Sequence, residues 1–435
     1  MTSIETSIQD KVVAFHTLGC RLNFSETGTI ARGFMERGYA VVPFGEPADV
    51  VFINTCTVTD GADSTCRNLI RKAHRSSPEA KIVVAGCYAQ MEAEAISQMQ
   101  GVDLILGTSE KYKVFDYLGE EERQLVKIDK SQDFWGAATS FGEGHTRAFL
   151  KIQDGCNYIC SFCIIPQARG RSRAISIDQA VANAKTLAAE GFKEVVLTGV
   201  NIGEYEATSG EKLTDLLEAL FAVEGIERWR LSSVEPNTIT DELLGLLKAS
   251  PKFLNHFHIP MQSGCDEVLT SMRRKYTVQE YRAVIEKIIS NFPEAGIGAD
   301  MIVGHPGETP EQFQETYALA KELPLTHFHL FPFSKRKGTT AANMQNYVHS
   351  AAKKERLKAL ELLGQAKLDL FSSDQVGETS EVLFEKRDKS GECFEGYTSN
   401  FVRVFVKTDS DLKNQVRKVH LTEFLNGRLM GEILH

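Results

Sequence analysis

The stretch Gly155-Cys156-Asn157-Tyr158-Ile159-Cys160-Ser161-Phe162-Cys163 places three cysteines in a CxxxCxxC pattern on one short loop. A loop this short can bring three sulfur atoms around one small metal centre. A [4Fe–4S] cluster is held by four thiolates, so three cysteines leave one iron free to bind another ligand. A zinc loop is the alternative, but zinc sites usually pair two short cysteine hooks, and the residues that follow Cys163 supply no second hook.

Phe162, the aromatic residue before the third cysteine, makes the loop similar to the cluster motif of the radical S-adenosylmethionine (SAM) superfamily. In that superfamily the amino and carboxylate groups of SAM chelate the free iron. The resemblance therefore implies that Cys156, Cys160 and Cys163 hold a [4Fe–4S] cluster and that SAM is a cofactor.

The composition indicates an ordinary globular protein. The chain has 435 residues, enough for about two to four domains, and is 42% apolar and 25% charged. No apolar run approaches the ~20 residues of a membrane span, and residues 1–10 lack a signal-peptide core. We therefore expect a cytoplasmic protein with no membrane partner. In that compartment the nine cysteines indicate metal ligands or catalytic groups rather than disulfides.

Residues 10–130 alternate apolar runs with amphipathic stretches, which predicts an α/β domain with a parallel sheet covered on both faces. The carboxyl ends of parallel strands lie at one edge of a sheet, where ligands bind. We expect a second metal cluster at this edge, although free cysteine is also often a small buried apolar residue. The strands Val12–Leu18, Val50–Thr55 and Ile82–Gly86 are followed by Cys20, Cys56 and Cys87.

Asn23 lies just past Cys20, next to the first helix. Its side chain could cap that helix or face the metal site.

A second series of strands begins at Arg147, after an irregular stretch, 131–146, that contains glycines and is typical of a linker. Six strands separated by helices favour a partial (β/α) barrel over residues 147–373, with its active face at the carboxyl ends of the strands. The predicted strands are Arg147–Gln153, Glu194–Leu197, Arg228–Leu231, Asn255–Ile259, Ile297–Val303 and His327–Phe331.

Polar turns follow these strands. Gly, Asn and Ser favour turns in any protein, but the shared position at the active face makes these turns candidates for binding SAM. Glycine lets backbone groups approach adenosine closely, and Asn, Ser and Glu can bind ribose hydroxyls. The candidate cofactor-binding residues are Phe162, Gly199, Asn201, Ser233, Glu235, Gln262 and Val303.

From Val376 the hydrophobic period changes to two, after a long predicted helix over 348–371. Short strands within residues 374–435 indicate a small antiparallel β-barrel. Barrels of this kind often bind RNA, but others are structural or bind protein.

Four basic clusters lie near these motifs and indicate a phosphate-bearing partner, despite the net charge of −9. A run of charge is often only a solvated face, and that alternative applies to each cluster. Among the residues around the motifs, Asn23, Arg169, Arg171 and Arg274 are the candidates for binding the substrate. The clusters are Arg67/Arg71/Lys72/Arg75, Arg169/Arg171/Arg173, Arg273/Arg274/Lys275 and Lys335/Arg336/Lys337.

The motifs together resemble the methylthiotransferase family along nearly the whole chain. The resemblance implies that Cys20, Cys56 and Cys87 hold an auxiliary [4Fe–4S] cluster and that the carboxyl-terminal barrel is a TRAM domain, an RNA-binding module. The matching motifs are Thr17–Asn23, Asn54–Thr59, Gly86–Gln90, Asp154–Cys156, Gln262–Gly264 and Met301–Glu308.

Leu18 before Gly19-Cys20, and Thr57-Val58-Thr59 after Cys56, resemble the branch that acts on N6-threonylcarbamoyladenosine in tRNA. That likeness implies the adenosine 3′ of the anticodon as substrate and a methylthio group at its C2 as the modification. The alternatives are the branches acting on isopentenyladenosine in tRNA and on an aspartate of a ribosomal protein.

The C2–H bond of adenine is strong and barely acidic, so the chemistry needs a radical route supplied by a cofactor. We expect an electron donor of the flavodoxin or ferredoxin type, and a monomeric enzyme. The two cysteine trios should face each other across a cavity large enough for a nucleobase.

Overall fold

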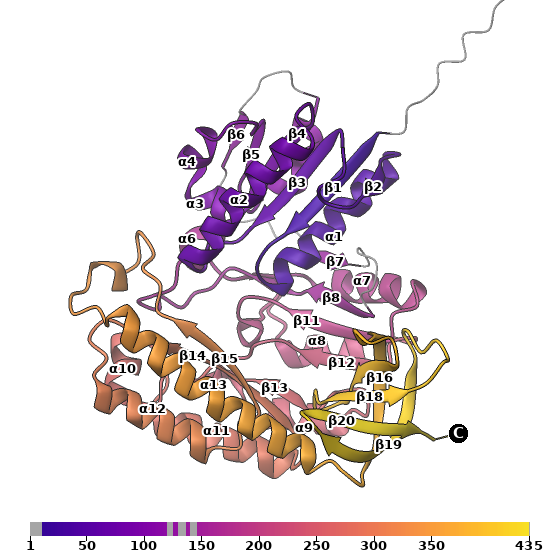
Figure 1. Cartoon of the computed structure of the whole chain (residues 1–435), viewed down its shortest axis with the longest axis vertical. Helices are drawn as coiled ribbons and strands as arrows, with labels where there is room; N and C mark the ends of the chain where they lie inside the picture. Colours follow the sequence, from indigo (N-terminus) through magenta and orange to yellow (C-terminus); the bar gives the residue numbers. More distant parts are fainter. Residues whose placement is uncertain (1–10, 120–124, 129–135, 140–145, 435) are drawn as a thin grey trace, which may run out of the picture.

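The computed structural model describes residues 11–119, 125–128, 136–139 and 146–434. Three parts follow one another along the chain: a parallel α/β part in indigo and purple, a partial barrel in magenta and orange, and a small closed barrel in yellow (Figure 1). Residues 1–10 and most of the predicted linker 131–146 lie outside the described residues. Within the described ranges, no helix has the length and apolar character needed to cross a membrane.

The amino-terminal part is a six-stranded parallel sheet with the order β2-β1-β3-β4-β5-β6. Ile53 and Val84 face one hydrophobic core, and Phe52 and Val83 face another on the opposite side. The prediction of a sheet covered on both faces is therefore confirmed. The strands are β1 Val12–Thr17, β2 Ala40–Val42, β3 Val50–Thr55, β4 Lys81–Gly86, β5 Leu104–Leu106 and β6 Leu125–Lys127. The helices are α1 Arg21–Glu36, α2 Asp60–Ser76, α3 Cys87–Met91, α4 Ala93–Ser97, η1 Glu110–Lys113 and α5 Val114–Tyr117.

The central part contains the six predicted parallel strands. β8, β11 and β12 form one sheet, and β13, β14 and β15 form another. Isolated bridges from Trp229 to Phe253 and from Ser233 to His258 connect the two sheets into one curved wall. The strands are β8 Arg147–Lys151, β11 Glu194–Thr198, β12 Arg228–Leu231, β13 His256–His258, β14 Gly296–Val303 and β15 His327–Pro332.

Helices and short elements complete this partial barrel. A strand, β7 (Ala137–Thr139), lies inside the predicted linker and pairs antiparallel with β8, so this part of the predicted linker joins the sheet of the central part. A small ladder joins β9 (Gln153–Asp154) to β10 (Arg173–Ala174) beside the cysteine loop. The helices are α6 Ile165–Arg169, α7 Ile177–Ala189, α8 Leu213–Phe221, α9 Asp241–Ala249, α10 Asp266–Ser271, α11 Val278–Asn291 and α12 Pro310–Glu322, with η2 Ile202–Glu204, η3 Pro236–Thr238 and η4 Ala341–Asn343.

Side chains alternate between the two faces of the barrel wall. Ile297, Ala299 and Met301 on β14 are buried in the core beneath the helices. Asp300 lies between them in the sequence and therefore faces the barrel lumen, as does Gly298. The same alternation on the neighbouring strands places polar and charged residues along the lumen.

The carboxyl-terminal part is a closed barrel that follows α13 (Ser350–Ser373), with the strand order β16-β17-β18-β20-β19. β18 and β20 pair in parallel, while the other neighbouring strands of the predicted small antiparallel barrel pair antiparallel. Strand directions can alternate all the way around a closed barrel only if the number of strands is even. Five strands therefore require at least one parallel pair. The strands are β16 Thr379–Arg387, β17 Cys393–Tyr397, β18 Arg403–Lys407, β19 Val416–Leu425 and β20 Arg428–Ile433.

This small barrel closes the amino-terminal end of the central lumen. Arg228 and Arg230 donate hydrogen bonds to the backbone carbonyls of residues 397–399. The Phe401 ring lies 4.7 Å from the ring of His256 and 5.7 Å from that of His327, centroid to centroid. A Cβ on Gly296 would lie 2.1 Å from a backbone oxygen of the small barrel. These contacts cover the amino-terminal ends of the described barrel strands.

Candidate functional site

The first cysteine trio lies on the loop between β9 and α6. The pKa of the Cys163 thiol is raised to about 12, first by burial and then by the neighbouring Cys160 and Cys156 thiols. The three thiols therefore lie close enough to repel one another when ionised. Cysteines bind a cluster as thiolates, so cluster binding would displace these protons. The trio fits the predicted three-thiolate site.

The backbone of this loop is held from several sides. Gly155 has a positive φ of 70°, and a Cβ there would lie 2.1 Å from the carbonyl oxygen of Arg171. Ser161 donates its backbone N–H to the carbonyl of Met272 at 3.0 Å, and its hydroxyl lies 3.1 Å from Nε2 of His305. Glycine is therefore required at position 155. The contacts of Ser161 fix the backbone of the loop before a cluster binds.

Arg274 contacts the first trio directly. Its guanidinium donates a hydrogen bond of 3.2 Å to Sγ of Cys160 and forms an ion pair with Glu235. Glu235 was predicted to bind the cofactor and Arg274 the substrate, but in the structure the two side chains hold each other. Hydrogen bonds to cluster sulfurs help set the reduction potential. These contacts fit a role for Arg274 in adjusting the cluster.

The second trio lies at the carboxyl edge of the amino-terminal sheet, as the strand pattern predicts. Cys20 caps α1, Cys56 follows β3, and Cys87 begins α3. The pKa of Cys56 is raised to about 12 by burial, with the Cys87 and Cys20 thiols contributing. A Cβ on Gly19 would lie 2.7 Å from Sγ of Cys56, so only glycine allows this approach. The second trio therefore also fits a three-thiolate cluster.

A buried charge network joins the two cysteine-bearing parts. Glu26 on α1 is fully buried and accepts hydrogen bonds from Lys111, from Lys151 at 2.8 Å and from Arg169 at 2.9 Å. Asp154 accepts from Lys151 at 2.7 Å and from Arg169 at 3.0 Å. Because Glu26 belongs to the amino-terminal part and Lys151, Asp154 and Arg169 to the barrel, the network fixes one trio relative to the other.

Two residues predicted to bind the substrate belong to this network. Asn23 donates to the carbonyls of Leu18 and Thr55 at 2.7 and 3.0 Å and accepts from Arg169 at 2.7 Å. Both Asn23 and Arg169 are buried. Their polar atoms are bonded to protein, so a positioning role fits them better than a substrate contact. Arg171, the third candidate near them, is exposed.

A cavity of about 260 Å³ lies beside Cys163 of the first trio. One wall contains Val58 and Thr59, which follow Cys56, and another contains Phe162 and Cys163. The remaining wall comes from the carboxyl ends of the barrel strands and includes Gln262, Asp300, Ile302 and Phe331. The cavity therefore adjoins Cys163 of the first trio and the segment that follows Cys56 of the second, and the arrangement of two trios facing each other across it stays a prediction.

The fit of SAM can be judged from buried polar atoms that lack a partner in the described part of the chain. Both amide atoms of Asn201 and Oε1 of Gln262 are in this state, and both residues were predicted to contact the cofactor. Oγ of Ser232 and one carboxylate oxygen of Glu204 are also unpartnered, and the sequence prediction missed them. These atoms suit the hydroxyl and amino groups of SAM. Ser232 was discoverable, since it directly follows β12.

The other residues predicted to contact the cofactor have different surroundings in the structure. The Val303 side chain is buried in the core under the helices, so that prediction is wrong for its side chain. Gly199 is packed closely, because a Cβ there would lie 2.7 Å from Ile202 and 2.9 Å from Gln153. Ser233 is half-buried next to β13. Phe162 lines the cavity and packs against a small apolar group formed by Cys265, Val268 and Met272.

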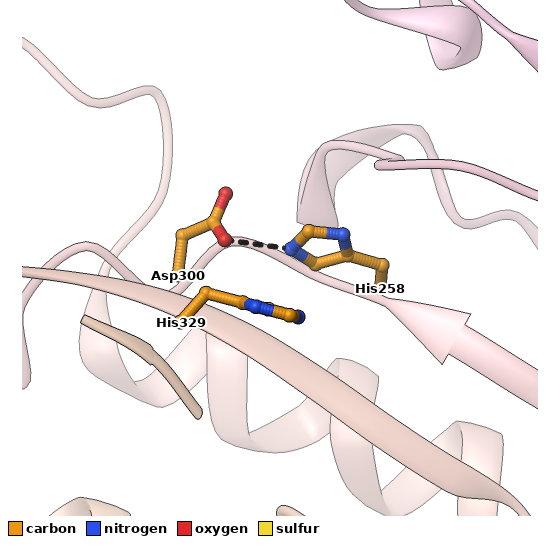
Figure 2. A group of neighbouring side chains, drawn as sticks. All are labelled: His258, Asp300 and His329. Carbon is orange, nitrogen blue, oxygen red and sulfur yellow. Dashed lines mark hydrogen bonds and ion pairs between the residues drawn. The ribbon is translucent and has the colours of Figure 1, made fainter. Parts of the chain in front are cut away.

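Three further side chains meet in the lumen below the cavity. Nε2 of His258 lies 2.8 Å from a carboxylate oxygen of Asp300, and the His329 ring lies 4.8 Å from that of His258 (Figure 2). The residues come from β13, β14 and β15. Sequence reasoning did not single them out, although their alternate positions on predicted strands were a usable signal.

Comparison with known proteins adds the following. The Radical SAM superfamily model matches residues 150–320, and the model described as Uncharacterized protein family UPF0004 matches residues 12–107. The chain is 41% identical to the threonylcarbamoyladenosine tRNA methylthiotransferase MtaB of Bacillus subtilis, over 94% of this chain and 93% of that protein. It is 32% identical to the tRNA-2-methylthio-N(6)-dimethylallyladenosine synthase of Fusobacterium nucleatum, over 98% of this chain and all of that one.

Among solved structures, the fold is similar to that of the radical S-adenosylmethionine methyltransferase TsrM from Kitasatospora setae. The TM-score is 0.56 at 15% identity, and the similarity covers 74% of this chain and 73% of the other. This likeness concerns the fold alone.

Proposed function

Because the chain belongs to the radical SAM tRNA methylthiotransferases of the MtaB type, we propose that it replaces the C2 hydrogen of N6-threonylcarbamoyladenosine in tRNA with a methylthio group. The observation that supports this proposal is a cavity of about 260 Å³ lined by Cys163 of one trio and by Val58 and Thr59, which follow Cys56 of the other trio. A single trio would suffice for SAM cleavage alone. The second trio gives the protein a place for a sulfur-bearing cluster next to the base.

Bound at these trios, two [4Fe–4S] clusters and SAM supply the radical and the sulfur that this substitution needs. The protein's own residues hold the reacting groups and keep water away. Ile302, Phe331 and Phe162 give the cavity walls a largely apolar surface. Asn201 offers both polar atoms of its amide, and Gln262 its Oε1 atom, as unpartnered groups for the cofactor. A dry, pre-formed cavity fits radical chemistry, because water and mobile groups would divert a reactive species.

The proposal includes the anticodon arm of tRNA as the partner. Several members of the basic clusters are exposed and can reach phosphates, whereas Arg169, Arg173, Arg274 and Arg336 are engaged in ion pairs inside the protein. The base has to leave the anticodon loop, and RNA loops are the parts of RNA that proteins read most easily. The small carboxyl-terminal barrel, as a TRAM domain, would add RNA contacts. The exposed basic residues are Arg71, Lys72, Arg75, Arg171, Arg273, Lys275, Lys335 and Lys337.

An electron donor of the flavodoxin or ferredoxin type, a monomeric state and a cytoplasmic location complete the proposal.

Dimethylallyladenosine in tRNA is the second candidate substrate, because a dimethylallyladenosine synthase is also a full-length relative. Its N6 substituent is apolar. The lumen beneath the cavity contains His258, Asp300 and His329, which suit a polar substituent better. The threonylcarbamoyl substrate therefore remains the first choice.

Purified enzyme with reconstituted clusters is expected to convert threonylcarbamoyladenosine-containing tRNA to the 2-methylthio product. Nucleoside mass spectrometry after reduction and SAM addition measures this. The same reaction with dimethylallyladenosine-containing tRNA, and with the ribosomal protein that carries the target aspartate, should yield little product. Methylthiolation mainly of either alternative would overturn the proposed substrate.

Removing two exposed lysines near the cavity is expected to weaken tRNA binding without affecting SAM cleavage. Lys335 lies beside a surface pocket that shares Thr59 and Phe333 with the cavity wall, and Lys337 follows it. The double change Lys335→Gln and Lys337→Gln should lower the slope of log Kd against log salt by about 2, because each lost phosphate contact removes about one.

The matched control changes two exposed lysines on helices of the barrel exterior, Lys185→Gln on α7 and Lys248→Gln on α9. Its salt slope should equal that of the wild type. An unchanged slope in the Lys335/Lys337 variant would show that these residues do not contact phosphate.

A further inference from the structure

A surface pocket of about 560 Å³ lies next to the cavity that adjoins Cys163. The two spaces have wall residues in common, which include Thr59, Pro332 and Phe333. The pocket therefore lies between the start of α2, which Thr59 caps, and the segment that joins β15 to α13 (Figure 1). A chain molecule with one unit in the cavity can place the next unit in this pocket.

Two aromatic side chains line the pocket, and both are held in place. The Tyr347 hydroxyl donates hydrogen bonds to the buried carbonyls of Ala341 and Ala342, at 3.1 and 2.9 Å, while the side chain as a whole is 42% exposed. Its polar end is therefore bonded to the protein, and the ring is the part that remains accessible.

The second ring supports the first. The ring centroid of Phe333 lies 6.1 Å from that of Tyr347, and the Phe333 backbone N–H donates to the carbonyl of Val303 at 2.8 Å. A ring fixed in this way offers a flat apolar surface that does not have to be ordered when a ligand binds.

Positive charge accompanies the rings. Nζ of the exposed Lys335 lies over the Tyr347 ring, 5.1 Å from its centroid. Nζ of Lys353 donates to the carbonyl of Phe333 at 3.1 Å. Among the described residues that line this pocket, none is acidic. The pocket therefore combines an aromatic surface with cations.

This combination favours a nucleotide over a protein side chain. Proteins that bind single-stranded nucleic acid stack the bases on aromatic rings and bind the backbone phosphates with basic side chains. The pocket also shares a wall with the cavity proposed to hold the target base. A neighbouring nucleotide is joined covalently to that base, so it is present at a high effective concentration once the base is bound.

We propose that the pocket formed by Tyr347, Phe333 and Lys335 binds the base of a nucleotide adjacent to the target adenosine in the anticodon loop, with Tyr347 as the stacking surface. This inference rests on the proposed function and identifies a second contact by which the enzyme holds the RNA. When the target base leaves the loop, its neighbour loses a stacking partner. The Tyr347 ring replaces that partner and offsets part of the cost of moving the base.

The test combines a change in the protein with a change in the RNA. Anticodon stem-loops that contain threonylcarbamoyladenosine are prepared complete, or without the base 5′ or 3′ of the target. Their Kd for the cluster-reconstituted enzyme is measured by fluorescence anisotropy. Tyr347→Ala should bind the complete loop about 10-fold more weakly, which is the usual size of a lost base–aromatic stack. Removing one of the two neighbouring bases should weaken binding to the wild type equally but should not weaken Tyr347→Ala further.

Tyr347→Phe keeps the ring and should bind nearly as tightly as the wild type. Leu362→Ala is the matched control, because it removes an apolar side chain that is 63% exposed on α13 outside the pocket. Tyr347→Ala should keep the wild-type slope of log Kd against log salt, whereas Lys335→Gln should lower it by about 1. Iron content and SAM cleavage are measured for every variant, so that damage to a cluster site is recognised.

The outcomes separate this inference from the proposed function. If the wild type methylthiolates the complete loop and Tyr347→Ala binds it equally well, the inference is wrong and the function stands. Additive losses, or no loss with either shortened loop, would also overturn the inference. So would a Tyr347→Ala enzyme that keeps RNA binding but is reduced slowly by a flavodoxin and normally by dithionite, since the pocket would then bind a protein. Absence of methylthio product would overturn the proposed function, while the binding comparison would still decide the inference.

Discussion

Changing Cys20, Cys56 and Cys87 to alanine is expected to abolish the methylthio product while SAM cleavage continues. These three thiols gather at the edge of the amino-terminal sheet, apart from the loop that carries Cys156, Cys160 and Cys163. Each trio can hold one [4Fe–4S] cluster, so the variant should lose about four irons per chain. Iron analysis, 5′-deoxyadenosine release after reduction and nucleoside mass spectrometry measure the three effects.

The reciprocal variant, with Cys156, Cys160 and Cys163 changed to alanine, should also lose about four irons but should release no 5′-deoxyadenosine. Cys393→Ala is the control, because this buried cysteine belongs to the carboxyl-terminal barrel. It should keep full iron content and both activities. If the Cys20/Cys56/Cys87 variant still formed methylthio product, the second trio would not serve sulfur insertion.

Replacing Glu26 with glutamine is expected to destabilise the junction between the two cysteine-bearing parts by about 3–5 kcal/mol, the usual cost of breaking a buried ion pair. The carboxylate is fully buried and faces Lys111, Lys151 and Arg169, whose side chains are at most 1% exposed. Glutamine keeps the size but removes the charge. Thermal unfolding and small-angle scattering should show a lower midpoint and a looser particle.

Glu190→Gln is the matched control. Glu190 pairs with Arg32 on α1, the helix that also carries Glu26, but the Glu190 side chain is 31% exposed. Its expected cost is below about 1 kcal/mol, as for surface ion pairs. Adding Lys111→Met to Glu26→Gln should restore part of the loss, since one unpaired cation is removed. Equal stabilities of the Glu26 and Glu190 variants would show that the network does not hold the parts together.

The carboxyl group of Glu26 also makes the stability of the protein depend on pH. Burial raises the pKa of Glu26, but Arg169, Lys111 and Lys151 outweigh it and hold the pKa well below its ordinary value. A depressed carboxyl pKa stabilises the fold above the unfolded value of about 4.3, and this contribution is lost as the pH falls. Wild-type stability should therefore fall more steeply on acidification than that of Glu26→Gln.

Much of the framework was predictable from the sequence because it depends on local patterns. The runs around Ile53 and Val84 are apolar on both faces, which only a covered parallel sheet explains. Cys20, Cys56 and Cys87 each follow a strand, so topology alone brought them together. The loop from Cys156 to Cys163 is short enough that sequence spacing already fixes its geometry.

The roles of the charged residues were less predictable, because pairing depends on contacts between distant parts of the chain. In the sequence Arg169 is one member of a basic run, yet in the structure it binds Glu26 of another domain. Val303 ends a strand at the active face, but its place in the strand alternation turns its side chain toward the helices.

Phe401 lies at the amino-terminal end of the lumen, and its position should limit the length of a substituent that the lumen can hold. At the level of His256 and His327 a substituent entering from the cysteine side would meet the Phe401 ring, which lies 4.7 and 5.7 Å from those two rings. An adenosine whose N6 substituent is longer than threonylcarbamoyl should therefore be held farther from Phe401. Its C2 atom would then be displaced from the sulfur. Phe401→Ala should deepen the channel and relax that upper limit, so that a domain far from the reacting atoms helps determine which base is accepted.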